Sequence, residues 1–192
     1  MKNIVVINAH PSGFSFCHAL ASKYIEVAKA AGFNIESIVL RDMQFDLNLK
    51  HGYLKRMELE PDLVEAWNKI SAADHLVIIY PTWWGTIPAN LKGFFDRLFL
   101  PGMAFKYREN SVWWDKLLAG KTAHIITTMD TPAWYYKIIY SNAGIKVLKN
   151  NILSFCGIKT NKVTIFSPIR NSTEASRSNM ILQIEKYASK GI

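Results

Sequence analysis

The chain has 192 residues, of which 49% are hydrophobic and 20% are charged, and its formal net charge is +8. This length and composition predict one globular domain over residues 1–192 and exclude a disordered chain. No stretch approaches the roughly 18 apolar residues of a membrane-spanning helix, and the apolar run near the N-terminus is too short for a signal peptide. We therefore expect a cytoplasmic protein without a membrane span.

The basic residues are spread along the chain and form no long run and no nucleic-acid motif. A diffuse positive field attracts phosphorylated cofactors as well as nucleic acid, and we favour the cofactor and expect no nucleic-acid partner. Cys17 and Cys156 are the two cysteines, and they form no CxxC pair or metal-type cluster. We expect no metal and no disulfide, which fits a reducing, intracellular compartment.

The first apolar run, Ile4 to Ile7, predicts a strand. Pro and Gly in the following residues 8–15, NAHPSGFS, predict a loop, and Ser15 is suited to cap a helix that extends to about Ala31. Gly32 supplies the C-terminal stop of this helix.

Ile35 to Leu40 reads as a second strand, and residues 41–61 form an irregular excursion. Asp62 can cap a helix that runs to about Ser71. The run from Leu76 to Tyr80 carries no charge, as expected of a third strand buried on both faces.

Pro81 ends the third strand, and the aromatic loop TWWGT follows at residues 82–86. From Ala89 the apolar residues fall at helical spacing. The expected unit is therefore strand, aromatic loop and helix.

Residues 99–120 form a long connection rich in aromatic side chains, and long structured loops are often functional. The next predicted elements are a strand at 122–128 and an aromatic loop at 129–136. A helix at 145–155, ended by Gly157, and a strand at 163–166 follow. Ser172 or Thr173 is expected to cap a last helix that runs to about Lys190. Five β-runs thus alternate with five helical segments, which predicts an α/β fold with a doubly wound, five-stranded parallel sheet of order 2-1-3-4-5.

In such a sheet the loops after strands one, three and four converge at the switch point, where ligands bind. The first loop enters a helix whose N-terminus favours a phosphate, and the other two bring tryptophans and tyrosines. A phosphate end and an aromatic end in one crevice suit a flavin. The alternative for the paired tryptophans is a loop whose indoles fold onto the core or into a subunit interface. The absence of GxGxxG after the first strand and of GxxxxGK[ST] argues against a dinucleotide fingerprint and a P-loop.

Four segments resemble the flavodoxin-like NAD(P)H:quinone oxidoreductases, a family that includes mammalian quinone reductase and bacterial reductases linked to potassium efflux. They span most of the chain in the family's order: AHPSGFSFCHAL (9–20), YPTWWGTIPANLKGFFDRLFLPGMAFKY (80–107), ITTMDTPAWYY (126–136) and LSFCGIK (153–159).

The resemblance implies which residues hold a flavin, FAD or FMN, with a slight preference for FAD. Those matched to the phosphate chain are His10, Ser15, Phe16 and Cys17. Those matched to the isoalloxazine loops are Pro81, Thr82, Trp83 and Trp84 in one loop, and Thr127, Thr128, Met129 and Asp130 in the other. The mammalian sequence has Asn at Cys17 and Gly-Gly at Met129 and Asp130.

By the same resemblance, Tyr135 matches a catalytic tyrosine that stabilises charge on the reduced flavin. The family's nearby histidine is replaced here by Ser141, and Tyr136 or Tyr140 could take over the role of that histidine. Phe105 and Tyr107 match residues that border the substrate pocket, partly from a second subunit, and Tyr136 is a further candidate for that pocket. The structural alternative for each tyrosine is ordinary packing with a tethered hydroxyl.

The implied activity is a ping-pong hydride transfer from NAD(P)H, through the flavin, to a quinone or a similar flat acceptor, in a homodimer. The alternative is a non-enzymatic electron carrier or a regulatory flavoprotein that docks on a partner such as an ion channel.

Overall fold

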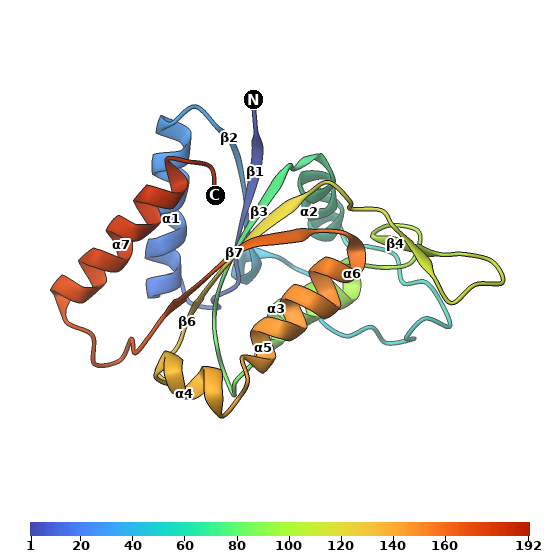
Figure 1. The fold of residues 1–192 in the computed structure, drawn as a ribbon. Coiled ribbons are helices and arrows are strands. Elements are labelled where there is room, and N and C mark those ends of the chain that lie inside the picture. Colours follow the sequence, from blue (N-terminus) through green and yellow to red (C-terminus); the bar gives the residue numbers. More distant parts are fainter.

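The computed structural model describes residues 1–192 and contains a five-stranded parallel sheet (Figure 1). Its strands, in the spatial order β2-β1-β3-β6-β7, are β2 (Asn34–Val39), β1 (Asn3–Asn8), β3 (His75–Pro81), β6 (Thr122–Thr128) and β7 (Lys159–Phe166). Because the two further strands lie outside this sheet, the order is the predicted 2-1-3-4-5. The α/β, flavodoxin-like architecture is therefore confirmed.

Helices cover both faces of the sheet (Figure 1). One face carries α1 (Phe16–Ala30) and α7 (Glu174–Ala188). The other carries α2 (Pro61–Ala72), α3 (Ala89–Leu98) and a continuous helical stretch made of α5 (Ala143–Lys146), the π-helical η2 (Val147–Leu153) and α6 (Ser154–Cys156). None of these helices combines the length and apolar character needed to cross a bilayer.

β3 lies in the middle of the sheet, and all of its residues are buried. Leu76 and Ile78 pack in the larger core, while Val77 and Ile79 pack in the smaller core beneath α1 and α7. This alternation explains the uncharged run in the sequence, because a strand covered on both faces has no solvent side for a polar residue.

The helix ends confirm several sequence predictions. The hydroxyl of Ser15 accepts a hydrogen bond from the His18 N–H at 3.1 Å, and Gly32 follows α1 with a left-handed φ of +88°. Thr173 caps α7, and Gly157, with φ +100°, follows α6.

Other boundaries differ from the prediction. α2 begins at Pro61 after Glu60, so Asp62 lies in the first turn, where its carboxylate accepts the Gln44 N–H at 2.6 Å. A proline at the first helical position costs no hydrogen bond, which moves the start of the helix forward. β7 begins at Lys159 rather than residue 163, β2 ends at Val39, and the 3₁₀ turn η1 (Leu40–Asp42) follows.

Two predicted loops contain regular structure. The connection 99–120 holds an antiparallel hairpin of β4 (Phe105–Tyr107) and β5 (Trp114–Lys116). The predicted aromatic loop at 129–136 runs into a short helix, α4 (Ala133–Ile138). These elements have three to six residues, too few to establish a hydrophobic period in the sequence.

The irregular segment 41–60 is fixed to the body by the buried side chain of Arg97. Its guanidinium forms an ion pair with Glu60, with Nη2 2.7 Å from Oε2, and also donates to the backbone carbonyls of Asp46 and Glu58 at 2.6 and 3.0 Å. The close approach of α3 to this segment requires Gly93, because a Cβ there would lie 2.8 Å from the Leu47 carbonyl oxygen. The ion pair and hydrogen bonds of Arg97 thus hold residues 41–60 in place, although this segment has little regular secondary structure.

Two histidines are fully buried on neighbouring strands at the opposite end of the sheet from the predicted site. His75 Nδ1 lies 2.7 Å from the hydroxyl of Thr122, and His124 Nε2 lies 2.8 Å from that of Thr164. Burial lowers the pKa of His75 to about 3 and that of His124 to about 4. Both rings are therefore neutral at pH 7 in the folded protein.

We predict that Arg97→Ala lowers the free energy of unfolding by about 3 kcal/mol, because removal of one partner leaves the other charge inadequately compensated. The expected loss lies at the lower end of the range for buried ion pairs because the Glu60 side chain is 30% exposed. Urea denaturation measures the change. Lys92→Ala removes an exposed pair with Asp96 and is the control, with an expected loss below about 0.5 kcal/mol. Equal losses in the two variants would contradict the role given to Arg97.

We also predict that the protein loses stability as the pH falls below about 6.5. The unfolded chain binds protons on His75 and His124 that the folded chain binds only near pH 3 to 4, so each histidine contributes a loss of about 1.4 kcal/mol per pH unit in that window. Above pH 6.5 both histidines are neutral in the folded and in the unfolded chain, so this loss of stability is absent there. Denaturation at several pH values measures the slope. His124→Gln should reduce it, whereas substitution of the exposed His51 by Gln should leave it unchanged.

Candidate active site

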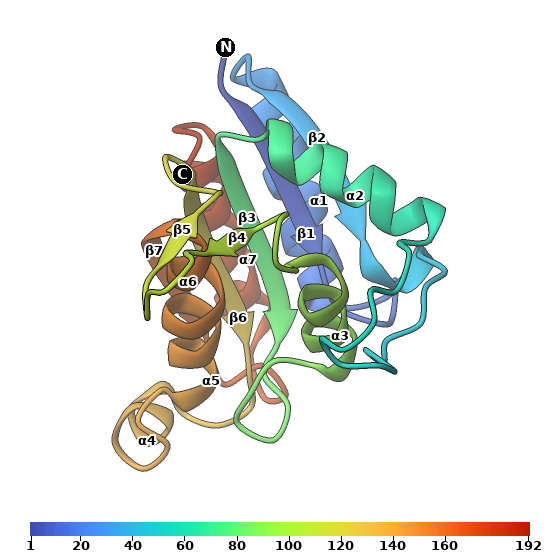
Figure 2. The same cartoon turned by 90° about the vertical axis from the view of Figure 1, so that its right-hand side faces the viewer.

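Three loops meet at the carboxyl ends of β1, β3 and β6, at the lower edge of the molecule in Figure 2. Hydrogen bonds join them: the Asn90 side chain donates to the Ala9 carbonyl at 3.1 Å, and the Thr82 N–H donates to the Thr128 carbonyl at 2.7 Å. β2 and β3 flank β1 on opposite sides, so this edge is the switch point of the sheet.

The first loop is held by a succession of side-chain to backbone bonds. Asn8 Oδ1 accepts the His10 N–H, His10 Nδ1 accepts the Ser12 N–H, and Ser12 Oγ accepts the Phe14 N–H, at 3.0 to 3.2 Å. Partial burial lowers the pKa of His10, which favours the neutral imidazole that this acceptor role needs. The loop therefore has a defined path into α1.

The N-terminus of α1 has unused donors. The N–H of His18 is bonded to Ser15, but the N–H groups of Phe16 and Cys17 have no acceptor within the protein. Free N–H groups at the positive end of a 15-residue helix attract an anion. This observation fits the phosphate end of a nucleotide cofactor.

The second loop holds its two indoles outside the core. Backbone bonds of 3.0 Å in both directions between Trp83 and Thr86 close a tight turn, which requires the left-handed conformations of Trp84 (φ +50°) and Gly85 (φ +73°). Trp84 is fully exposed, and Trp83 is 45% exposed with its ring 5.8 Å from that of His10. In the single protomer the indoles do not fold back onto the core.

In the third loop, the side chains of Met129 and Asp130 are engaged in contacts within the protein. Met129 is buried against Tyr136 and Ile145. Asp130 forms an ion pair with Arg170 at 3.3 Å and also accepts that residue's N–H at 2.7 Å. The groups of residues 129 and 130 that are available to contact a bound ring are therefore those of the backbone.

The polar side chains at the strand ends are paired with one another. The hydroxyls of Thr82 and Thr127 lie 2.7 Å apart, and Cys17 Sγ lies 3.2 Å from the hydroxyl of Thr128. Burial raises the pKa of the Cys17 thiol to about 11, so it is an unreactive core residue.

Tyr136 is a structural link between the second loop and the next helices. Its buried hydroxyl donates to the Gly85 carbonyl at 2.9 Å and accepts the Gly144 N–H at 3.1 Å. A Cβ on Gly144 would lie 2.5 Å from the Thr86 Cα, so only glycine permits this approach. Tyr135, on the same helix, is 37% exposed, with its ring 5.6 Å from those of Trp134 and Tyr140.

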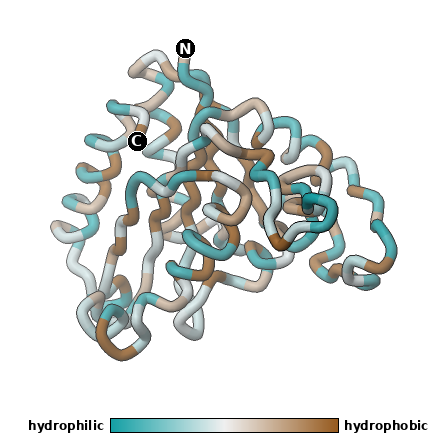
Figure 3. Tube along the Cα trace, turned by 45° about the vertical axis from the view of Figure 1, so that its right-hand side comes forward, coloured by the Kyte–Doolittle hydropathy of each residue, from teal (hydrophilic) through white to brown (hydrophobic).

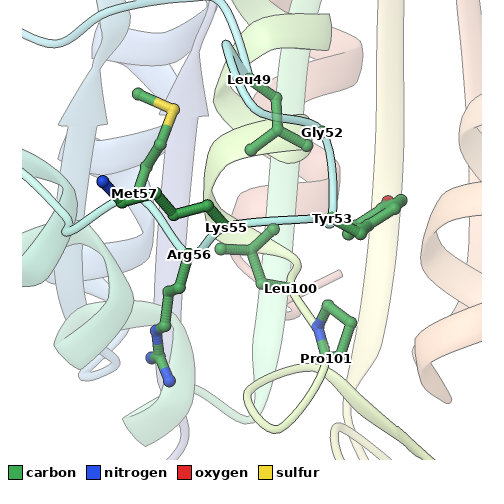
Figure 4. Close-up of a pocket in the computed structure, with 8 residues that line it drawn as sticks. All are labelled: Leu49, Gly52, Tyr53, Lys55, Arg56, Met57, Leu100 and Pro101. Carbon is green, nitrogen blue, oxygen red and sulfur yellow. The ribbon is translucent and has the colours of Figure 1, made fainter.

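The predicted substrate-pocket residues do not all meet in one protomer. Phe105 and Tyr107 lie on β4, away from the edge that carries the loops (Figure 1). Phe105 is buried against Phe155, and Tyr107 is exposed. An aromatic cavity of about 230 Å³ adjoins them, and a basic cavity of about 160 Å³ near Lys55 and Arg56 lies beside it (Figure 4). Neither cavity includes a residue of the three loops.

Sequence analysis did not identify Asn90 or Gly144, although both position the loops. Asn90 is a polar residue in the first helical turn after a buried strand, which is a usable signal. Gly144 lies inside a helical stretch where glycine is unfavourable, and that cost is the signal of a close contact.

We predict that Tyr136→Phe lowers the free energy of unfolding by about 1–3 kcal/mol, because the Gly85 carbonyl and the Gly144 N–H both lose their partner. Thermal or urea denaturation measures the loss. Tyr140→Phe is the matched control, since the exposed Tyr140 hydroxyl has no hydrogen bond within the protein. An unchanged stability of Tyr136→Phe would show that the link is dispensable.

Comparisons with known proteins agree with this geometry. The profile of a family described as having a flavodoxin-like fold matches residues 2–188. An uncharacterized NAD(P)H oxidoreductase of Haemophilus influenzae is 29% identical over 185 residues, covering 93% of this chain and 90% of that protein. NAD(P)H dehydrogenase [quinone] 1 of Cavia porcellus is 28% identical, covering 83% of this chain and 66% of that longer protein.

Among solved structures, an FMN-dependent NADH-azoreductase of Bacillus anthracis in complex with FMN superposes with a TM-score of 0.74. It is 22% identical and covers 99% of each chain. The family match extends over nearly the whole chain and agrees with the strand order found here. The chain therefore belongs to the family with the flavodoxin-like fold, among relatives named as NAD(P)H oxidoreductases and quinone reductases.

Proposed function

We propose that this protein is a flavin-dependent NAD(P)H:quinone oxidoreductase. The observation that carries the proposal is the pairing, at one switch point, of free N–H groups on the α1 N-terminus with two exposed indoles. Relatives named as NAD(P)H oxidoreductases and NAD(P)H dehydrogenases support the same reaction class.

The phosphate end of the cofactor would lie at the start of α1. The N–H groups of Phe16 and Cys17 donate to it, the helix dipole adds positive potential, and Ser15 fixes the helix terminus. His10 orients the loop through its bond from the Ser12 N–H. None of these roles requires a charged side chain at the site.

The planar end of the cofactor would lie along Pro81–Trp84 and the backbone of residues 127–130. Trp83 and Trp84 provide flat apolar surface, and the N–H groups of Trp84 and Gly85 have no acceptor within the protein. The Thr82 and Thr127 hydroxyls pair with each other and so fix the separation of the two loops.

When bound, a flavin supplies hydride acceptance from NAD(P)H and hydride donation to a flat acceptor, in a ping-pong order. The chain would contribute stacking surface, backbone donors and the hydroxyl of Tyr135, a residue of α4 that is 37% exposed. Tyr136 cannot take that part, because its hydroxyl is already bonded on both sides.

FMN and FAD are the two candidates for the cofactor. The solved azoreductase with FMN is a structural neighbour, and the slight preference for FAD rests on the resemblance of residues 9–20. Chromatography of the released cofactor distinguishes FMN from FAD.

We further propose a homodimer that completes the pocket. Tyr107, Val112 and Trp113 on or beside the β4–β5 hairpin are exposed, and so are the indoles at the loop edge. Because these two apolar regions lie apart in one protomer, a two-fold arrangement can bring the hairpin of each copy over the loops of the other.

We predict that the purified protein binds a flavin and oxidises NADH or NADPH with a quinone, giving parallel double-reciprocal lines. The visible spectrum, chromatography of the released cofactor and steady-state rates measure this. Trp84→Ala should weaken flavin binding about tenfold, because a stacking surface is lost at no cost to the core. Leu182→Ala, an exposed change on α7, is the control.

A protein that takes up neither FMN nor FAD would contradict the proposal. A protein that binds flavin but shows no turnover with either nicotinamide would favour an electron carrier or a regulatory flavoprotein instead.

A further inference from the structure

Two tyrosines, Tyr24 on α1 and Tyr80 on β3, are fully buried and have no hydrogen-bond partner for their hydroxyl groups. The strands at the centre of the tube in Figure 3 are mostly brown, which marks hydrophobic residues. An unpaired phenol hydrogen in such surroundings costs free energy. Tyr24 lies in the smaller core, about two turns into α1, whereas Tyr80 lies at the carboxyl end of β3, two residues before Thr82.

Tyr80 lies beside a pair of threonine hydroxyls. Its register partner on β6 is Thr127, so both side chains emerge on the same face of the sheet. Thr127 Oγ1 lies 2.7 Å from Thr82 Oγ1, and neither hydroxyl has another partner within the protein. Burial raises the pKa of the Tyr80 phenol, the nearby Tyr136 raises it further, and the Thr127 hydroxyl lowers it as a side-chain hydrogen-bonding neighbour. Tyr80 therefore keeps its hydrogen at neutral pH, with the Thr127 oxygen as a candidate acceptor.

Burial decides between the two orders in which these three hydroxyls can donate. Tyr80 and Thr127 are both 0% exposed, whereas Thr82 is partly exposed. If Thr82 donated to Thr127, and Thr127 to Tyr80, the phenol hydrogen would stay unpaired in the core. In the opposite order Tyr80 donates to Thr127 and Thr127 donates to Thr82. The hydrogen left over is then that of Thr82, so no donor is buried without an acceptor.

We propose that Tyr80 is a positioning residue that acts through Thr127 and makes Thr82 a hydrogen-bond donor toward a ring bound in the crevice. The inference rests on the proposed flavin-dependent function, because Thr82 belongs to the loop assigned to the planar end of the cofactor. A donor stabilises the negative charge that a ring gains on reduction, whereas a lone pair at the same place repels it. Hydrogen bonds in a chain polarise one another, so the buried Tyr80 hydroxyl strengthens the Thr82 donor without contacting the ring.

The midpoint potential of the bound flavin tests this proposal. Thr82→Val nearly keeps the shape of the side chain and removes the donor. It should lower the ratio of affinities for reduced over oxidised flavin about tenfold, which is about 30 mV for a two-electron couple. Tyr80→Phe should lower the same ratio about threefold, or about 15 mV. Tyr24→Phe removes the other unpaired buried hydroxyl and is the matched control, with an unchanged potential.

The double variant separates an effect through Thr82 from a general effect on packing. Because Tyr80 acts through Thr82, Tyr80→Phe should not change the potential of a protein that already carries Thr82→Val. A shift that persists in the double variant overturns the proposal. An unchanged potential in Tyr80→Phe, or an equal shift in Tyr24→Phe, also overturns it.

A second readout uses the protein without flavin. If Tyr80 donates to Thr127, Tyr80→Phe should lower the melting temperature by a few degrees. Tyr24→Phe has no bond to lose and should leave the melting temperature unchanged or raise it. A melting temperature of Tyr80→Phe at or above the parent value removes the basis of the chain and overturns the proposal.

Failure of the proposed function has its own signature in the parent protein. A parent protein that binds flavin without turnover refutes the proposed activity, while the potentials of the variants still decide the role of Tyr80. A parent protein that takes up no flavin overturns both, because Thr82 then has no ring to contact.

Discussion

Burial of β3 on both faces is the constraint on which the rest of the structure depends. The strand contributes side chains to both hydrophobic cores, and its neighbours β1 and β6 pair with it residue by residue. Once its register is set, the carboxyl ends of all three strands lie at one level. The pairing of the strands is then sufficient to bring the loops that follow them next to one another. The candidate site is thus a consequence of sheet order more than of any single loop sequence.

At that edge several side-chain hydroxyls are hydrogen-bonded within the protein and fix the scaffold. Thr82 pairs with Thr127, Thr128 with Cys17, and Tyr136 with two backbone groups. What stays available is backbone N–H, aromatic surface, the hydroxyl of Tyr135 and the hydrogen that the proposed chain leaves on Thr82. A site of this kind recognises shape and phosphate and tolerates varied substituents on a flat ligand, because few directional side-chain contacts exclude them.

Sequence reasoning predicted the long, strongly patterned elements well. The uncharged run of β3, the Ser15 cap and Gly32 each have a local physical cause that is visible in the sequence. It did not find the β4–β5 hairpin or α4, which are too short to show a period. It also did not find the role of Arg97, because a buried ion pair joins segments far apart in the chain and has no local signature. Of the site, it predicted which loops meet, whereas the inward turn of Met129 and the pairing of Asp130 with Arg170 depend on tertiary contacts.

Gly144 makes two segments of the chain behave as one. With no Cβ, the start of α5 lies against the backbone of Thr86 and Gly85, and the Tyr136 hydroxyl binds both sides of this contact. A displacement of the 82–88 turn must therefore carry α5 with it, or break these bonds. Amide hydrogen exchange at the start of α5 would then report on whatever occupies the tryptophan loop, although α5 itself need not touch that ligand.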